Sequence, residues 1–259
     1  MLSRRVFLTG VSATGAAALL PGCTNDRQES HPSRLRARPT ATVSPSRSVA
    51  VGEPQPLGLA PGARDALLYV PPGVGQDAPE WFVLCLHGAG GNATRGLRLL
   101  LPVADAAGLV LLAPSSKDAT WDAIRDGYGA DVAAIDRAMD MAFGRVRVAP
   151  RRLAVAGFSD GASYALGLGL ANGNLFSRVI AFSPGFIPQA PRLGRPAVFV
   201  SHGTRDSVLP INSTSRRIVP ALREDQYAVT YREFDGRHSV PPAVAKEAAS
   251  LLAGDGPRA

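Results

Sequence analysis

Cysteine is scarce in this chain of 259 residues, which contains two, Cys23 and Cys85. Small exported domains without a sufficient hydrophobic core usually depend on several disulfides. Cys85 lies in the apolar run at residues 81–86 and is expected to be a buried thiol, while Cys23 has a separate expected role near the N-terminus. The sequence therefore predicts no disulfide and a fold that depends on its hydrophobic core alone.

Long hydrophobic segments and metal-binding or nucleic-acid-binding patterns are also missing. The apolar stretch at residues 6–20 is too short, and too rich in Gly, Ser and Thr, to span a bilayer comfortably. The formal net charge is +7, but no RRM, helix-turn-helix or zinc-finger pattern accompanies it, so nucleic-acid binding is not expected. The four histidines lack an H-x-x-x-H spacing and an acidic cluster, so no metal or other cofactor is expected.

The N-terminus carries the pattern of an export signal. Arg4 and Arg5 precede the apolar stretch, which resembles a Tat signal. The sequence L-P-G-C at residues 20–23 resembles a lipoprotein processing box, although proline is unusual inside it. Residues 1–23 are therefore interpreted as a Tat-type signal, and Cys23 as the lipid-bearing residue that anchors the protein at the outer face of the bacterial cytoplasmic membrane or in the envelope. An ordinary cleaved signal and an uncleaved anchor are the alternatives.

The composition changes after the signal. Residues 24–61 are rich in Pro, Ser, Thr and Arg and poor in aliphatic side chains. Such a segment cannot bury enough apolar surface to offset the entropy of ordering, so it is predicted to be a disordered tether. Its arginines either rest on anionic headgroups or are simply solvated. Residues 62–253 are predicted to form one domain with a substantial core, and residues 254–259 a flexible tail.

Within the domain, apolar runs of strand length alternate with helical patterns. One such helix is indicated by Val132, Ile135, Met139 and Ala142, which fall on a single helical face. The alternation predicts an α/β fold with a mostly parallel sheet, helices on both faces, and a site at the carboxyl edge of the strands. Strands are predicted near residues 66–70, 82–86, 109–113, 153–156, 179–182, 198–201 and 229–234.

The most informative motif is G-x-S-x-G at residues 157–161. It follows the β-prone run at residues 152–156 and precedes a helical segment at about residues 162–171. Between a strand and a helix this motif forms a nucleophile elbow, a turn so tight that the residues two positions before and after the serine must lack bulk, hence Gly157 and Gly161. Ser159 is therefore the predicted nucleophile, at the start of a helix whose N-terminal dipole favours negative charge.

A glycine-rich loop, H-G-A-G-G-N at residues 87–92, follows the second predicted strand. Its glycines let the backbone turn sharply and expose N–H groups. An oxyanion hole takes one amide from such a loop and one from the residue after the nucleophile. The predicted donors are the backbone amides of Ala89 and Asp160, and a plain strand-to-helix turn is the alternative.

Two late loops offer the acid and the base. Asp206 follows the sixth predicted strand and is the predicted acid. Asp235 is the alternative acid, but it lies only three residues before His238, whereas the orienting acid normally comes from a separate loop. His238 follows the last strand and is the predicted general base; a turn aspartate and a surface-loop histidine are the alternatives. His87 and His202 precede glycines at strand ends and are expected to support loops.

These elements occur in the order oxyanion loop, Ser, Asp, His, so the chain resembles the α/β-hydrolase superfamily across about residues 66–252. Within it, the motifs H-G-A-G-G at residues 87–91, A-G-F-S-D-G-A-S-Y at 156–164 and H-G-T-R-D at 202–206 resemble the compact bacterial carboxylesterase, phospholipase/carboxylesterase and polyhydroxybutyrate-depolymerase-like group. Only residues 183–195 separate two late strands, too few for the cap domain of typical lipases. The resemblance implies an α/β-hydrolase fold without a cap and a serine hydrolase that forms an acyl-enzyme.

The resulting hypothesis is a serine esterase that cleaves short- or medium-chain or phenolic carboxylic esters, as a monomer or small homo-oligomer. Trp121, Phe158 and Phe186 are predicted to line the acyl pocket, with ordinary packing as the alternative. The other hypotheses are an acyltransferase, a polyester depolymerase or a peptidase that uses the same triad, and a catalytically inactive binding module.

Overall fold

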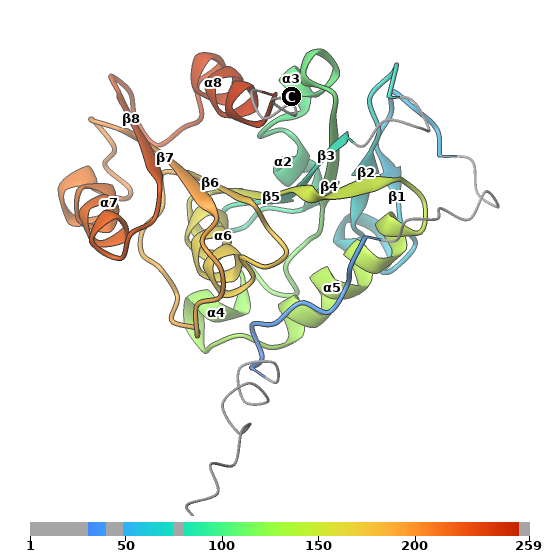
Figure 1. The fold of residues 1–259 in the computed structure, drawn as a ribbon, viewed down its shortest axis with the longest axis horizontal. Helices are drawn as coiled ribbons and strands as arrows, with labels where there is room; N and C mark the ends of the chain where they lie inside the picture. Colours follow the sequence, from blue (N-terminus) through green and yellow to red (C-terminus); the bar gives the residue numbers. More distant parts are fainter. Residues whose placement is uncertain (1–30, 40–48, 75–79, 254–259) are drawn as a thin grey trace, which may run out of the picture. The chain divides into compact units, whose positions relative to one another are not determined.

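The computed structural model of the protein describes residues 31–39, 49–74 and 80–253 (Figure 1). The predicted signal at residues 1–23, with Cys23, and the predicted tail at residues 254–259 lie outside the described residues. In the part of the chain that is described, no helix is long and apolar enough to cross a membrane.

Eight strands form one sheet. They are β1 (Gln55–Pro56), β2 (Leu67–Tyr69), β3 (Glu80–Leu86), β4 (Leu109–Ala113), β5 (Val148–Phe158), β6 (Arg178–Phe182), β7 (Ala197–Gly203) and β8 (Val229–Phe234). Their order across the sheet is β1-β2-β4-β3-β5-β6-β7-β8 (Figure 1). The strands from β3 to β8 pair in parallel, whereas β1 and β2 pair antiparallel with each other and β2 with β4. All seven predicted strands are present, and β1 is an addition.

Helices cover both faces of the sheet, as predicted. They are α2 (Ala93–Leu97), α3 (Leu101–Ala107), α4 (Asp122–Arg125), α5 (Ala130–Phe143), α6 (Asp160–Ala171), α7 (Ser215–Glu224) and α8 (Pro242–Ala253), with 3₁₀ turns η1 (Gly62–Arg64) and η2 (Ile211–Ser213). Figure 1 shows α5 and α6 below the sheet and α2, α3 and α8 above it. The connection between β6 and β7, residues 183–196, contains no helix, so no cap domain lies there.

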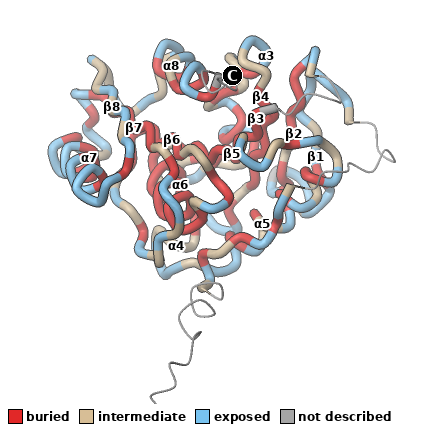
Figure 2. Tube along the Cα trace, in the orientation of Figure 1, coloured by how far each residue is buried: buried red, intermediate tan, exposed pale blue. Residues whose placement is uncertain are grey.

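The central strands are buried on both faces (Figure 2). Along β3, Phe82 and Leu84 face the cluster formed with α5 and α6, while Val83 and Cys85 face the cluster formed with α2 and α8. This period of two on a sheet covered on both sides explains why the strands read as continuous apolar runs. Cys85 is the buried free thiol that the sequence predicted. Burial raises the pKa of this thiol, which keeps it protonated and unreactive.

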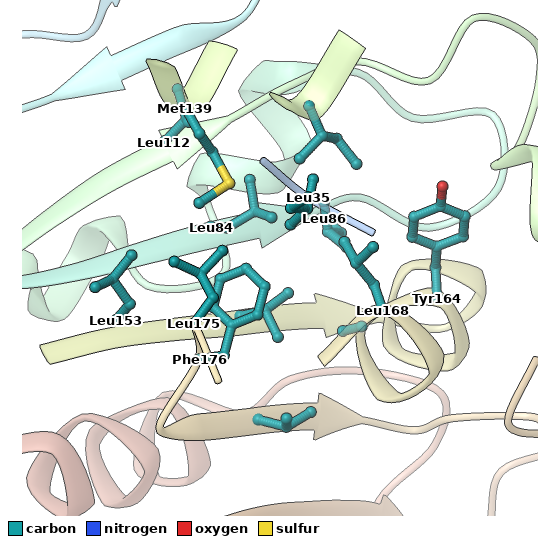
Figure 3. Close-up of a cluster of buried hydrophobic side chains, with 14 of the residues drawn as sticks. Leu35, Leu84, Leu86, Leu112, Met139, Leu153, Tyr164, Leu168, Leu175 and Phe176 are labelled. Atoms are coloured by element: carbon teal, nitrogen blue, oxygen red, sulfur yellow. The ribbon is translucent and has the colours of Figure 1, made fainter. Parts of the chain in front are cut away.

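The disordered tether predicted for residues 24–61 is wrong for much of its length. Residues 31–39, here called the N-terminal strap, pack on the domain, and so do residues 49–61, which include β1. Leu35 and Leu57 are 2% and 3% exposed. Leu35 belongs to the same buried cluster as Leu84, Leu86 and Leu168 (Figure 3).

Side chains of two helices satisfy the backbone of the strap. Asn172, at the end of α6, accepts a hydrogen bond from the Leu35 N–H at 2.9 Å and donates one to the Ser33 carbonyl at 2.7 Å. Asp136 on α5 accepts from the N–H groups of Arg36 and Ala37 at 2.7 and 2.8 Å. The polar composition of this segment does not reveal these contacts. They consist of two buried apolar side chains, Leu35 and Ala37, and four hydrogen bonds to backbone groups of the strap.

Replacement of Leu35 by alanine tests whether the strap contributes to stability. Removal of a fully buried leucine side chain is expected to lower the free energy of unfolding by about 2–4 kcal/mol, because apolar contacts are lost and a cavity remains. Urea unfolding measures the change. The matched control is Val51→Ala, since Val51 is 56% exposed and its truncation should change stability by less than about 0.5 kcal/mol. Equal stability of Leu35→Ala and Val51→Ala would show that the strap is dispensable.

Candidate active site

Ser159 occupies a strained turn between β5 and α6. Its backbone angles are φ 57° and ψ −122°, a conformation that a non-glycine residue adopts only where its surroundings enforce it. A Cβ atom on Gly157 would overlap the Gly161 carbonyl, and one on Gly161 would overlap the carbonyls of Leu86 and His87. The bare backbones of the elbow and of the end of β3 are therefore in contact, which explains the two glycines.

The glycine-rich loop at residues 87–92 passes beside Ser159. A Cβ atom on Gly88 would lie 3.2 Å from the Ser159 Cβ. The Ala89 N–H has no hydrogen-bond acceptor among the described residues, and Asp160 is the first residue of α6, where no intrahelical acceptor exists. Both amides predicted for the oxyanion hole are thus unpaired, and their role stays a prediction.

The predicted acid and base are hydrogen-bonded. The His238 Nδ1 lies 2.6 Å from the Asp206 Oδ2, and the Asp206 side chain is fully buried. The other carboxylate oxygen accepts from the N–H groups of Val208 and Leu209, both at 2.9 Å. Burial works to raise the pKa of Asp206, but the Leu209 amide and the His238 ring outweigh it and hold that pKa below its ordinary value. An ionised Asp206 fixes the proton on Nδ1 of His238 and leaves Nε2 to accept one.

Asp235, the alternative acid, is not at the site. Its carboxylate forms an ion pair of 2.8 Å with Arg205, and its side chain is 81% exposed.

His238 lies beside the elbow because its ring packs against an aromatic side chain of that turn. Its imidazole stacks on Phe158, with the ring centroids 4.6 Å apart and the planes at 38°. A Cβ on Gly203, at the end of β7, would lie 2.5 Å from the carbonyls of Gly236 and Arg237, so β7 packs directly against the histidine loop. Among the described residues no hydrogen bond joins the Ser159 hydroxyl to His238. Such bonds are often long in unliganded enzymes and tighten when substrate binds.

His87 and His202 support loops, as expected from their position before glycine. Nδ1 of His87 donates to the Gly88 carbonyl at 2.8 Å, and its Nε2 accepts from the Ser116 N–H at 3.0 Å. His202 was expected to hold a loop, but its direct contact with the acid was missed. Its Nε2 lies 2.8 Å from the Leu209 carbonyl and 3.1 Å from the Asp206 Oδ2. The i, i+4 spacing in H-G-T-R-D was the available signal.

His202 is held neutral. Burial is the main cause that lowers the pKa of this imidazole. Since the carbonyl and the carboxylate accept hydrogen bonds only, the proton resides on Nε2, and Nδ1 accepts from the Ser215 hydroxyl at 2.7 Å. His202 therefore contacts the same carboxylate oxygen of Asp206 that His238 contacts, without adding a charge.

The aromatic residues predicted to line the acyl pocket lie in three different environments. Trp121 has no exposed surface, so its assignment to the pocket is corrected: its indole N–H needs an acceptor and donates to the His87 carbonyl at 2.8 Å, behind the glycine-rich loop. Phe158 is half-buried against His238, and Phe186 is 45% exposed. Val208, which the sequence did not single out, is 63% exposed next to the acid.

The charged and nucleophilic residues of the described ranges include no group of three or more His, Cys, Asp or Glu side chains that could hold a metal ion. What the site offers chemically is a strained serine hydroxyl, an imidazole oriented by a carboxylate, and two unpaired backbone amides.

Comparisons with known proteins agree with this arrangement. Residues 130–253 match the family model described as phospholipase/carboxylesterase, and this region contains Ser159, Asp206 and His238. The structure of esterase PE8 aligns with a TM-score of 0.58 at 23% identity, over 71% of this chain and 97% of that one. The chain has the α/β-hydrolase fold. The predicted fold class and the resemblance to this group of esterases are therefore confirmed.

Two further solved structures are similar. A phospholipase/carboxylesterase from Dyadobacter fermentans aligns with a TM-score of 0.53 at 22% identity, over 80% of this chain and 99% of that one. A ferulic acid esterase from Anaeromyces mucronatus, in complex with ferulic acid, aligns with a TM-score of 0.51 at 15% identity, over 73% and 84%. No match to a curated protein was found. These neighbours share the fold of this chain, and the family match indicates a hydrolase of the esterase kind.

The lowered pKa of Asp206 predicts how the acid contributes to stability as the pH changes. A carboxylate with a depressed pKa in the folded state stabilises the fold above its unfolded pKa of about 3.9, and this contribution disappears as the pH falls through the folded value. The free energy of unfolding of Asp206→Asn is therefore expected to lie below that of the wild type near about pH 6 and to approach it at about pH 2–3. Asp235→Asn is the control, because its exposed carboxylate should give a small difference at either pH. A deficit for Asp206→Asn that does not change with pH would contradict the assignment.

Proposed function

We propose that this protein is a serine esterase that hydrolyses carboxylic esters through an acyl-enzyme, with Ser159 as nucleophile, His238 as general base and Asp206 as orienting acid. The observation that carries the proposal is the 2.6 Å bond between His238 and the buried Asp206, on a ring that packs beside the strained serine elbow.

The chemistry follows from these groups. Nε2 of His238 takes the proton of Ser159 as the hydroxyl attacks the ester carbonyl, and Asp206 stabilises the imidazolium that forms. The amides of Ala89 and Asp160 bind the oxyanion, and the loss of one such donor costs about 3 kcal/mol in the transition state. The imidazolium then protonates the leaving alcohol. Water, deprotonated by the same imidazole, releases the acid and restores the serine.

The surroundings of the triad form an open site, which favours small substrates. The described chain has no cap over the site, and the connection after β6 places the exposed Phe186 near the elbow, since its N–H donates to the Ser163 Oγ at 3.4 Å. That hydroxyl lies 3.4 Å from the Ser159 carbonyl. Phe186 and Val208 are both exposed apolar side chains, which suit short or medium acyl chains or the aromatic ring of a phenolic ester.

Ser159→Ala tests the proposal. The variant is expected to lose about 10⁴-fold or more in kcat toward nitrophenyl esters, because the nucleophile is removed, while its thermal unfolding stays close to that of the wild type. A fluorophosphonate probe should label the wild type at Ser159 and leave the variant unlabelled, as detected by mass spectrometry.

The same assay separates the alternatives. Wild-type protein that neither reacts with the probe nor cleaves esters of two to twelve acyl carbons (about the range from short to medium chains) would indicate an inactive binding module. Faster transfer of the acyl group to an added alcohol than to water would indicate an acyltransferase.

We also propose that the protein is exported and anchored to a membrane by lipid on Cys23. The support is the arginine pair and the processing box in the sequence. Cys23→Ala is expected to move the protein from the membrane fraction to the soluble fraction, because the acyl chains that hold it are lost, and to retain esterase activity. Immunoblotting of the two fractions, with and without globomycin, measures this. Membrane association that persists in Cys23→Ala would contradict lipidation.

A further inference from the structure

A single loop contacts both halves of the predicted oxyanion hole. The loop between β4 and α4, residues 114–121, reaches the glycine-rich loop through the Ala119 carbonyl, which accepts from the Gly90 N–H at 2.6 Å. The next residue, Thr120, donates its hydroxyl to the Asp160 Oδ2, also at 2.6 Å. Gly90 directly follows Ala89, whose amide is one predicted donor, and Asp160 supplies the other. Two consecutive residues of the loop, Ala119 and Thr120, therefore bind beside the two predicted donor amides.

The same loop is firmly held from behind. Trp121 donates to the His87 carbonyl at 2.8 Å. The buried Asp131 accepts from the Lys117 and Asp122 N–H groups, both at 2.8 Å. These contacts tie both ends of the segment around Thr120 to the domain, so the Thr120 hydroxyl is presented to Asp160 from a fixed position.

The direction in which the Asp160 carboxylate points affects the predicted oxyanion hole. Asp160 is half-buried, and its own backbone amide is a predicted donor to the oxyanion. A carboxylate beside the point where negative charge develops opposes that charge, and the opposition is strong where water is excluded. A carboxylate that accepts a hydrogen bond from a fixed hydroxyl is held in one direction.

We propose that Thr120 is a positioning residue of the oxyanion hole, acting through its hydrogen bond to Asp160. The bond holds the Asp160 carboxylate away from the oxyanion and keeps the α6 amide in register with the Ala89 amide. This inference rests on the esterase function proposed above. It concerns transition-state stabilisation, so it predicts a loss in kcat at nearly constant KM.

The test compares Thr120→Val, which removes the hydroxyl at nearly constant shape, with Thr120→Ser, which keeps it. For Thr120→Val, kcat per active site toward a nitrophenyl ester is expected to fall about 10- to 100-fold, with KM within about threefold. Phenylboronic acid, which forms a tetrahedral adduct with an active serine, should bind more weakly by a similar factor. Thr120→Ser should restore both values to within about threefold of the wild type. Thr230→Val, at an exposed threonine on β8, is the matched control and should match the wild type.

A double-mutant cycle isolates the pair. In an Asp160→Ala background, Thr120→Val should lower kcat by less than about threefold, because its partner is gone. Active sites are counted by complete fluorophosphonate titration, so that unfolded protein is excluded from kcat.

The outcomes are distinct. Unchanged kcat in Thr120→Val, equal losses in the valine and serine variants, or a loss that titration accounts for as unfolded protein would each overturn the role of Thr120. Wild-type protein that the probe does not label would overturn the proposed function instead.

Discussion

The contact between bare backbones at the elbow is the constraint on which the site depends. Gly161 packs under the carbonyls of Leu86 and His87, and Gly157 packs against Gly161. No side chain fits between these segments, so the end of β3 and the start of α6 approach as closely as two backbones can. This approach places the glycine-rich loop beside Ser159 and forces the serine into its positive φ. The strain is stored at the residue whose hydroxyl must be held in a fixed position.

The polar groups at the carboxyl edge of the sheet are arranged in pairs that fix one another. Asp206 receives two amide hydrogen bonds and contacts two imidazoles, so its negative charge is matched by four donors. His87 uses both ring nitrogens to hold the glycine-rich loop. Because a buried polar group without a partner is costly, these networks specify loop conformations that glycine-rich segments would not adopt alone.

Much of the architecture could be predicted because the relevant signals are local. Each predicted strand is a short apolar run, and the order of loop, Ser, Asp and His follows from the position of each residue just after a strand. The packing of the strap could not be predicted because the side chains that hold it, Asn172 and Asp136, lie about 100 to 140 positions away along the chain. The position of Trp121 could not be predicted for a similar reason. The sequence does not distinguish an aromatic side chain that faces a substrate from one that, like Trp121, donates to a backbone carbonyl behind the site. The contact of His202 with Asp206 depends on the curvature of one loop, which spacing alone does not specify.

Helix α6 connects the candidate active site with the N-terminal strap, two regions that the sequence analysis did not link. Its first residue follows the nucleophile, and the residue that ends it, Asn172, binds the strap. The helix is buried along almost its whole length and spans the layer from the carboxyl edge of the sheet to the opposite edge. Glycines at positions 167 and 169 let it lie directly against Tyr128 and β5–β6 side chains, so it has no room to slide. The strap therefore packs against the C-terminal end of the helix whose N-terminal end adjoins Ser159.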